Sequence, residues 1–244
     1  MNKNITYATY TNIGSREKNE DSIGCFYKEC DYGFIVCDGL GAHGMGEVAS
    51  DLAVKVFERL FKESNRRDSI VGNVLKMAQK EILALQEEKN AHNKMKTTAV
   101  ILTIGKRKVY IGHIGDSRCY VFHKDKIEWR TQDHSLLQML VHSGQIKEDE
   151  IRFHPDRNTL LNALGDKCES IIFDTMSKIK ADRKTSFLLC SDGFWELIEE
   201  KEMCEALKNA ETVEQWLEKM VAIVDENGSG KDMDNCSAIV VWCR

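Results

Sequence analysis

The chain has 244 residues, of which 42% are hydrophobic and 30% charged, as in an ordinary globular protein. This composition excludes disordered, collagen-like and miniprotein architectures, because a chain of this length buries a sizeable core without a disulfide or metal. The net charge of −5 comes from 34 basic and 39 acidic residues with no long run of one sign, which argues against nucleic acid as a partner. We expect a single domain over residues 1–244.

No segment has the length and apolar character of a membrane span, and residues 1–14 lack the apolar stretch of a signal peptide. We therefore expect no membrane association and a cytoplasmic location. The nine cysteines form no CxxC pair, which argues against both a disulfide framework and a zinc site. They are expected to be reduced and mostly buried.

Short apolar or alternating runs, typical of strands, occur along the whole chain. They cover residues 5–9, 33–37, 98–104, 109–114, 119–122, 170–174, 187–190 and 237–242. Only a tight connection containing Lys106-Arg107 separates Ile104 from Val109, so these two strands are predicted to form an antiparallel hairpin.

Apolar residues spaced three and four apart predict two long helices, over 48–61 and 71–85, the second capped by Asp68. Later helices are predicted over 135–143, 201–208 and 213–224, the last capped by Thr212. Since strands precede and follow the two long helices, the order favours packed antiparallel sheets with helices outside over a βαβ alternation.

Acidic residues stand at the ends of five apolar runs: Glu20-Asp21, Asp38, Asp116, Asp192 and Asp234-Asn235. Each could be an ordinary turn residue, since Asp-Gly is a frequent turn pair. If the strand ends converge, however, several like charges share one small volume, and divalent cations commonly keep such a cluster ionised. Ligands that are all oxygen indicate a hard ion such as Mg²⁺ or Mn²⁺ rather than zinc.

Two glycine-rich segments resemble nucleotide-binding loops. Residues 39–44 match GxGxxG, but Asp38 would place a negative charge beside a pyrophosphate, and a second helix follows where a parallel strand is required. Residues 228–231 hint at a phosphate loop, but Asp232 replaces the required Ser or Thr and no strand precedes it. The sequence therefore favours neither type of nucleotide site.

A series of short motifs runs through nearly the whole chain. In order they are Arg16-Glu17-Lys18-Asn19-Glu20-Asp21; Asp38-Gly39 with Gly41, His43, Gly44, Gly46, Ala49 and Ser50; Thr97-Thr98-Ala99; Ile114-Gly115-Asp116-Ser117-Arg118; Asp133-His134-Ser135 with Gly144; His154-Pro155 with Arg157-Asn158 and Ala163-Leu164-Gly165; Cys190-Ser191-Asp192-Gly193; and Asp234-Asn235. Read together, they resemble the metal-dependent protein phosphatases of type 2C, the PPM family, and its bacterial members in particular.

This resemblance implies an α+β fold, a β-sandwich of two antiparallel sheets flanked by helices, with a binuclear Mn²⁺ or Mg²⁺ centre at one end. By position, Asp38 looks like the carboxylate that bridges both ions. Asp192 and Asp234 look like ligands of one ion, and the carbonyl of Gly39 looks like a ligand of the other.

The resemblance also implies roles for residues around these ligands. Glu20 and Asp21 would act on the second ion largely through water, and Asp116 is similar to the residue that holds a third, weaker metal in bacterial members. Arg16 would grip the substrate phosphate, for which a guanidinium fork is well suited. Its alternative is a surface arginine paired with Glu17 or Glu20.

The implied activity is hydrolysis of phosphoserine and phosphothreonine in proteins, opposing a cognate kinase. Monoester hydrolysis is among the slowest uncatalysed reactions, and paired metals accelerate it by lowering the pKa of water and clamping the in-line displacement. Residues 134–166 would form the family's variable flap, which helps to choose substrates. The alternatives are a non-catalytic phosphoprotein-binding module and a phosphatase for small phosphoesters.

The chain departs from the family pattern at three positions. Ala42 stands where a second glycine is common, and Lys96 where glycine usually precedes the Thr-Thr pair. Leu40 stands where animal members have a histidine proposed to protonate the leaving alcohol, so the general acid stays unassigned. His43 and His134 could be structural or act behind the ligands, and for His134 we favour a structural role.

Overall fold

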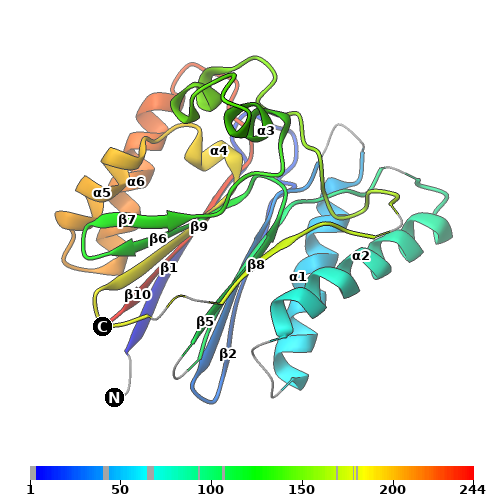
Figure 1. Cartoon of the computed structure of the whole chain (residues 1–244), viewed down its shortest axis with the longest axis horizontal. Helices are drawn as coiled ribbons and strands as arrows, with labels where there is room; N and C mark the ends of the chain where they lie inside the picture. Colours follow the sequence, from blue (N-terminus) through cyan, green and yellow to red (C-terminus); the bar gives the residue numbers. More distant parts are fainter. Residues whose placement is uncertain are drawn as a thin grey trace.

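The computed structural model describes residues 4–40, 44–64, 69–92, 94–105, 108–168, 170–177, 179 and 181–244. Its centre is a pair of five-stranded antiparallel sheets packed face to face (Figure 1). One sheet has the order β1 (Ile5–Asn12), β10 (Cys236–Cys243), β9 (Thr185–Cys190), β6 (Arg118–His123), β7 (Lys126–Arg130). The other has the order β2 (Ser22–Lys28), β3 (Asp31–Cys37), β4 (Ala99–Ile104), β5 (Val109–Ile114), β8 (Asp174–Met176).

Helices cover the outer face of each sheet, which confirms the predicted α+β sandwich (Figure 1). α1 (Gly46–Glu63) and α2 (Ile70–Glu88) pack on the β2–β5 sheet, while α5 (Glu200–Lys208) and α6 (Val213–Gly228) pack on the other. Three short helices lie together at one end of the sandwich: α3 (Leu136–His142), the 3₁₀-helix η2 (Glu148–Phe153) and α4 (Asp192–Trp195).

The central strands are buried on both faces, which explains their nearly continuous apolar sequences. In β3, Phe34 and Val36 point into the core between the sheets, whereas Ile35 and Cys37 point toward α1 and α2. Successive side chains of a strand alternate between its faces, so one apolar run contributes to two cores. Such a strand has a fixed register, because a slip of one residue would exchange its two faces.

Most predicted elements are confirmed, with bounds that differ by a few residues. Thr212 caps α6, since its side chain accepts a hydrogen bond of 3.2 Å from the Gln215 amide. The predicted hairpin pairs Ile104 with Val109, although Lys106-Arg107 lies outside the described residues. Asp68, the predicted cap of the second helix, lies outside them too.

The hydrophobic pattern misplaced one strand and left two others, β2 and β7, out of the predicted set. The strand expected over 170–174 begins only at Asp174, because Ile171 and Phe173 pack against the α1–α2 core instead of joining the sheet. β7 was not predicted, because this edge strand, Lys126–Arg130, is mostly polar. An edge strand can remain polar because it has a strand on one side only.

All nine cysteines are free and five are buried, as expected from their scattered positions. Within the described ranges, no helix combines the length and the apolar character needed to cross a bilayer.

Candidate metal and phosphate site

The acidic positions meet because several strands begin or end at the same end of the sandwich. In one sheet Ser22 pairs with Cys37, which places Asp21 near Asp38. In the other sheet Ala238 pairs with Cys190, so the residues before β10 lie close to those after β9. The predicted convergence of strand ends is therefore confirmed.

A cavity of about 540 Å³ opens at this junction. Seven of the eight predicted site residues line it: Arg16, Glu20, Asp38, Gly39, Asp116, Asp192 and Asp234. The eighth, Asp21, lies behind the cavity wall, where its Oδ2 accepts a hydrogen bond of 2.8 Å from the Ser191 hydroxyl. The structure thus gathers residues that are up to 218 positions apart in the chain.

Asp38 is held by the two threonines that precede β4. Its carbonyl accepts hydrogen bonds of 2.8 Å from both the Thr97 hydroxyl and the Thr98 amide, and its own amide donates to Thr98 Oγ1 at 3.0 Å. Thr98 Oγ1 also shares a 2.7 Å hydrogen bond with the Ser117 hydroxyl, next to Asp116. These contacts give the Thr-Thr pair a positioning role that sequence reasoning did not assign.

Gly39 permits close approach of three chain segments. A Cβ atom at this position would lie 2.5 Å from both the Glu20 carbonyl oxygen and the Gly46 carbonyl carbon. Since real Cβ atoms do not come this close to backbone, a side chain here would push these segments apart. The same packing lets the Gly39 amide donate to the Glu20 carbonyl at 3.2 Å.

The carboxyl groups in and behind the cavity are buried close to one another, so their charged forms are unfavourable without a counter-ion. Burial, followed by repulsion from Asp192, raises the pKa of Asp38 well above its usual range. Burial and the Asp116 charge do the same to the pKa of Asp192. The pKa of Asp116 rises to about 7 through burial and the nearby Asp133 charge, and that of Asp21 rises to about 6 mainly through burial.

Two buried carboxylate oxygens support the same conclusion. Asp21 Oδ1 and Asp116 Oδ1 have no hydrogen-bond partner within the described residues. A buried acceptor without a partner is costly. Divalent cations would satisfy such oxygens and offset the shared negative charge, and an all-oxygen donor set suits Mg²⁺ or Mn²⁺. The residues present therefore fit the ions expected from the sequence.

Arg16 lines the cavity and pairs with Asp234 rather than with Glu17 or Glu20, the partners of the alternative surface role. Its guanidinium donates two hydrogen bonds, of 2.9 and 2.8 Å, to the carboxylate of Asp234. Both side chains are partly exposed, at 46% and 39%. The guanidinium thus lines the cavity, and its two hydrogen bonds engage a planar pair of oxygen acceptors.

Asn235 anchors the loop that carries Arg16 and Glu20. Its side-chain amide donates to the carbonyls of Ile13 and Lys18 at 2.8 and 2.9 Å, and its Oδ1 accepts from the Glu20 amide at 2.7 Å. Sequence reasoning identified Asp234-Asn235 as a motif without giving Asn235 a role. Asn235 is more than 200 positions from the loop that it contacts, so its sequence neighbours do not indicate this role. The Asp234-Asn235 motif was the only sequence signal for it.

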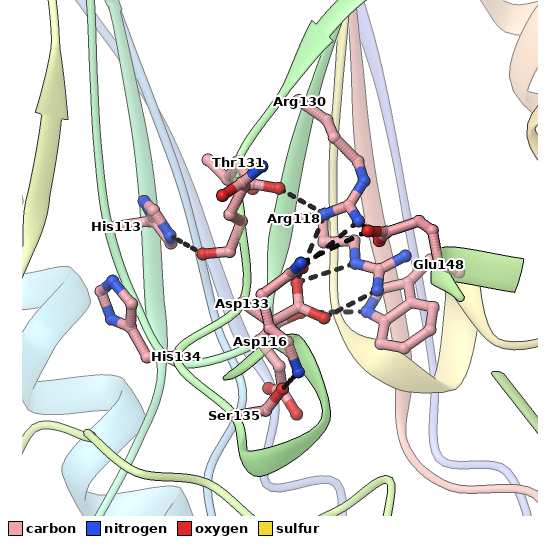
Figure 2. Close-up of polar contacts among 12 residues, drawn as sticks. His113, Asp116, Arg118, Arg130, Thr131, Asp133, His134, Ser135 and Glu148 are labelled. Carbon is pink, nitrogen blue, oxygen red and sulfur yellow. Dashed lines mark hydrogen bonds and ion pairs between the residues drawn. The ribbon is translucent and has the colours of Figure 1, made fainter. Parts of the chain in front are cut away.

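A buried ion pair stands behind Asp116 (Figure 2). Arg118 donates two hydrogen bonds to Asp133, of 2.9 and 2.7 Å, and its guanidinium lies 3.4 Å from the centre of the Trp195 ring. The Trp195 indole in turn donates to the Asp116 carbonyl at 3.0 Å. This chain of contacts fixes the backbone of Asp116 from the side away from the cavity.

The predicted flap supplies one rim of the cavity. Asn158, Leu160, Ala163 and Asp166 line it from segment 134–166, together with Arg16 and Lys18 from the N-terminal loop. Lys96, where the family pattern has glycine, also lines the cavity and forms a 2.7 Å ion pair with Asp166. Lys96 therefore ties the end of the flap to the start of β4.

Leu40 and Ala42 are the other departures from the family pattern. Leu40 lines the cavity, so an apolar side chain stands where animal members have a histidine. Gly41, Ala42 and His43 lie outside the described residues. His134 does not line the cavity.

The family model described as Protein phosphatase 2C matches residues 10–236. The serine/threonine phosphatase stp of Listeria innocua is 33% identical over 233 residues, covering 93% of this chain and 90% of the relative.

Solved structures with the same fold include two phosphatases. A bacterial serine phosphatase superposes with a TM-score of 0.89 at 28% identity, covering 99% of this chain and 98% of the other. The catalytic domain of the serine/threonine protein phosphatase PstP in complex with two manganese ions superposes with a TM-score of 0.81 at 25% identity, covering 98% of both chains.

Proposed function

The chain belongs to the protein phosphatase 2C family, and we propose that it hydrolyses phosphoserine and phosphothreonine in proteins with Mn²⁺ or Mg²⁺ bound in the acidic cavity. The observation that carries this proposal is the convergence of Asp38, Asp192 and Asp234 on one cavity. The relatives and solved structures described above are named as serine or serine/threonine phosphatases.

In this proposal the roles of the acidic residues follow the positions set out in the sequence. Asp38 would bridge two ions, Asp192 and Asp234 would bind one of them, and the Gly39 carbonyl would bind the other. Glu20 and Asp21 would act behind the second ion, and Asp116 would hold a third. Ions bound there supply water of lowered pKa and neutralise charge on the phosphoryl oxygens.

Arg16 would bind the substrate phosphate. Its guanidinium already forms a two-point contact with a carboxylate at the cavity, and a phosphate presents a similar pair of acceptors. Because Arg16 is about half exposed, it can turn toward a substrate without losing core packing. The protein needs no covalent nucleophile in this scheme.

The open rim favours a protein substrate over a small one. The cavity is lined both by Arg16 and Lys18 of the N-terminal loop and by Asn158, Leu160 and Asp166 of the flap. Residues flanking a phosphorylated side chain could contact both rims. We therefore propose phosphoproteins as the substrates. We further propose that the activity belongs to the cytoplasm, where it would oppose a cognate kinase.

The proposal is tested by hydrolysis of a phosphothreonine peptide and of a sugar phosphate after metal removal and Mn²⁺ addition. We expect the peptide to be turned over only with Mn²⁺, at a kcat/KM at least tenfold above that of the sugar phosphate. Asp38→Asn, which keeps the shape of the side chain, should lower peptide turnover by about 10³-fold, or ~4 kcal/mol of transition-state stabilisation.

The rival functions give different results in the same assay. Preference for the sugar phosphate would indicate a phosphatase for small esters. Mn²⁺ binding without hydrolysis of either substrate would indicate a phosphoprotein-binding module and would overturn the proposed activity.

A further inference from the structure

Three metal-ligating side chains gather outside the acidic cavity. His113 of β5, His134 in the turn before α3 and Asp174 at the start of β8 each place one ligand atom within 4.8 Å of the other two. None of them lines the cavity that holds Asp38. Their positions are far apart in sequence, so they form none of the short spacings typical of a zinc site.

The backbone holds these residues together. His113 and Asp174 are directly paired across the β5–β8 ladder. The His134 amide donates to the Gly115 carbonyl at 2.9 Å, which fixes His134 beside the end of β5. Figure 2 shows the rings of His113 and His134 next to each other, and their centres are 4.6 Å apart.

His113 is prepared to act as a ligand. It is 3% exposed, and its Nε2 donates a 2.8 Å hydrogen bond to the Gln132 carbonyl. A donating Nε2 leaves the lone pair on Nδ1, and a hydrogen bond of this kind is the usual support behind a metal-bound histidine. Burial, and then the neighbouring His134, lower the pKa of His113 to about 4, so the ring is neutral near pH 7.

His134 and Asp174 supply the other two donors. His134 Nε2 lies 3.3 Å from Asp174 Oδ2. Two atoms that each lie about 2.1 Å from one ion are roughly 3.4 Å apart at a tetrahedral angle, so this pair is spaced for a shared ion. The Asp174 side chain is 67% exposed, which leaves the site open to ions from solvent.

Coordination by His134 has a local consequence. Its Nδ1 accepts a 3.3 Å hydrogen bond from the Gly115 amide, so the ring proton now resides on Nε2. An ion at Nε2 would displace that proton, and a neutral ring would then carry its proton on Nδ1. The long bond from Gly115 would be given up, next to Asp116 of the acidic cavity.

We propose that a ring nitrogen of His113, the Nε2 of His134 and a carboxylate oxygen of Asp174 form a separate site for a transition-metal ion such as Zn²⁺. Two imidazoles and one carboxylate suit Zn²⁺ or Co²⁺, whereas hard ions such as Mg²⁺ prefer oxygen alone. Three protein ligands leave a fourth position open. His113 and Asp174 also line a cavity of about 410 Å³, with Trp129, Arg130 and Met176.

The test is titration of the full chain with Co²⁺ and Zn²⁺ in the Asp38→Asn background, which weakens binding in the acidic cavity. We expect one equivalent of Co²⁺ to give the visible absorption of a tetrahedral nitrogen-ligated ion, and Zn²⁺ to displace it. His134→Gln and Asp174→Asn should each lower the affinity at least tenfold. Both residues are less deeply buried than His113, so the variants should keep the parent's circular dichroism and melting temperature.

His92→Gln is the matched control, because His92 is an exposed histidine away from the cluster. It should leave the Co²⁺ spectrum and the affinity unchanged. The proposal is overturned if the parent shows no nitrogen-ligated Co²⁺ spectrum, or if folded His134→Gln and Asp174→Asn bind Co²⁺ and Zn²⁺ as tightly as the control. Neither readout depends on phosphatase activity.

Discussion

Arg16 and Asp234 form a partly exposed ion pair that lines the acidic cavity. Their two hydrogen bonds join a cation proposed to bind phosphate to a carboxylate proposed to bind metal. The pair is partly exposed, so its own contribution to stability is small, at about 0–1 kcal/mol. Its importance therefore lies in the position of the guanidinium rather than in folding.

Arg16→Lys tests this role. Lysine keeps the positive charge but cannot make a planar two-point contact with phosphate. We expect KM for a phosphothreonine peptide to rise roughly tenfold, about 1.4 kcal/mol of binding, with a smaller change in kcat. Arg59→Lys, at an exposed pair with Glu81, is the control and should leave both constants unchanged. An unaltered KM in Arg16→Lys would contradict phosphate binding by Arg16.

At the scale of elements, the turn between β5 and β6 is held by the strand and helix that pack behind it. Gly115 has a φ of 94°, and Arg118, which begins β6, is 2% exposed and bound to Asp133. Removing one member of a buried pair leaves an uncompensated charge, which typically costs 3–5 kcal/mol. The pair also stands on the Trp195 ring, whose indole binds the Asp116 carbonyl.

Asp133→Asn should therefore lower the free energy of unfolding by about 3–5 kcal/mol, measured by urea denaturation. Asp51→Asn is the control, since the exposed Asp51–Lys55 pair on α1 should contribute less than about 1 kcal/mol. Equal losses in the two variants would show that the Arg118–Asp133 pair does not support this turn.

Sequence reasoning succeeded where apolar runs defined strand ends, and failed where contacts depended on packing. Asp38 and Asp192 could be placed at the ends of strands because the runs before them are uninterrupted. The Lys96–Asp166 pair could not be foreseen, because it joins a strand to a flap whose path is set by tertiary contacts. β7 escaped prediction because a polar edge strand lacks the apolar pattern of its neighbours.

At the scale of the whole molecule, two stable sheets hold a cluster of like charges together. The core clusters on both faces of each sheet fix the strand ends, so the carboxylates cannot move apart to relieve repulsion. The metal-free fold therefore keeps carboxyl groups whose pKa values are raised. The repulsion among these carboxylates destabilises the metal-free fold. Cations that bind the folded state and neutralise the carboxylates therefore stabilise it.

The raised pKa values of the buried carboxyl groups predict how the free energy of unfolding of the metal-free protein depends on pH. The folded pKa values of Asp21 and Asp116, about 6 and about 7, lie above their unfolded values near 4. Between these limits the folded state binds more protons than the unfolded state, so the free energy of unfolding should fall as pH rises from about 4 to 7.

Chemical denaturation in EDTA across this pH range should reveal the decrease, on the order of 1 kcal/mol or more. Mn²⁺ should abolish or reverse it, because ions bind the deprotonated carboxylates of the folded state. Stability that rises steadily with pH in EDTA would contradict the buried, mutually repelling carboxyl groups.

The central claim is that Asp38, Asp192 and Asp234 hold divalent ions in one cavity. Anomalous diffraction at the manganese edge, from crystals of the full chain grown with Mn²⁺, measures this most directly. We predict at least two anomalous peaks within the cavity, in contact with these three carboxylates. A cavity without peaks at saturating Mn²⁺, or peaks only elsewhere on the molecule, would contradict the account.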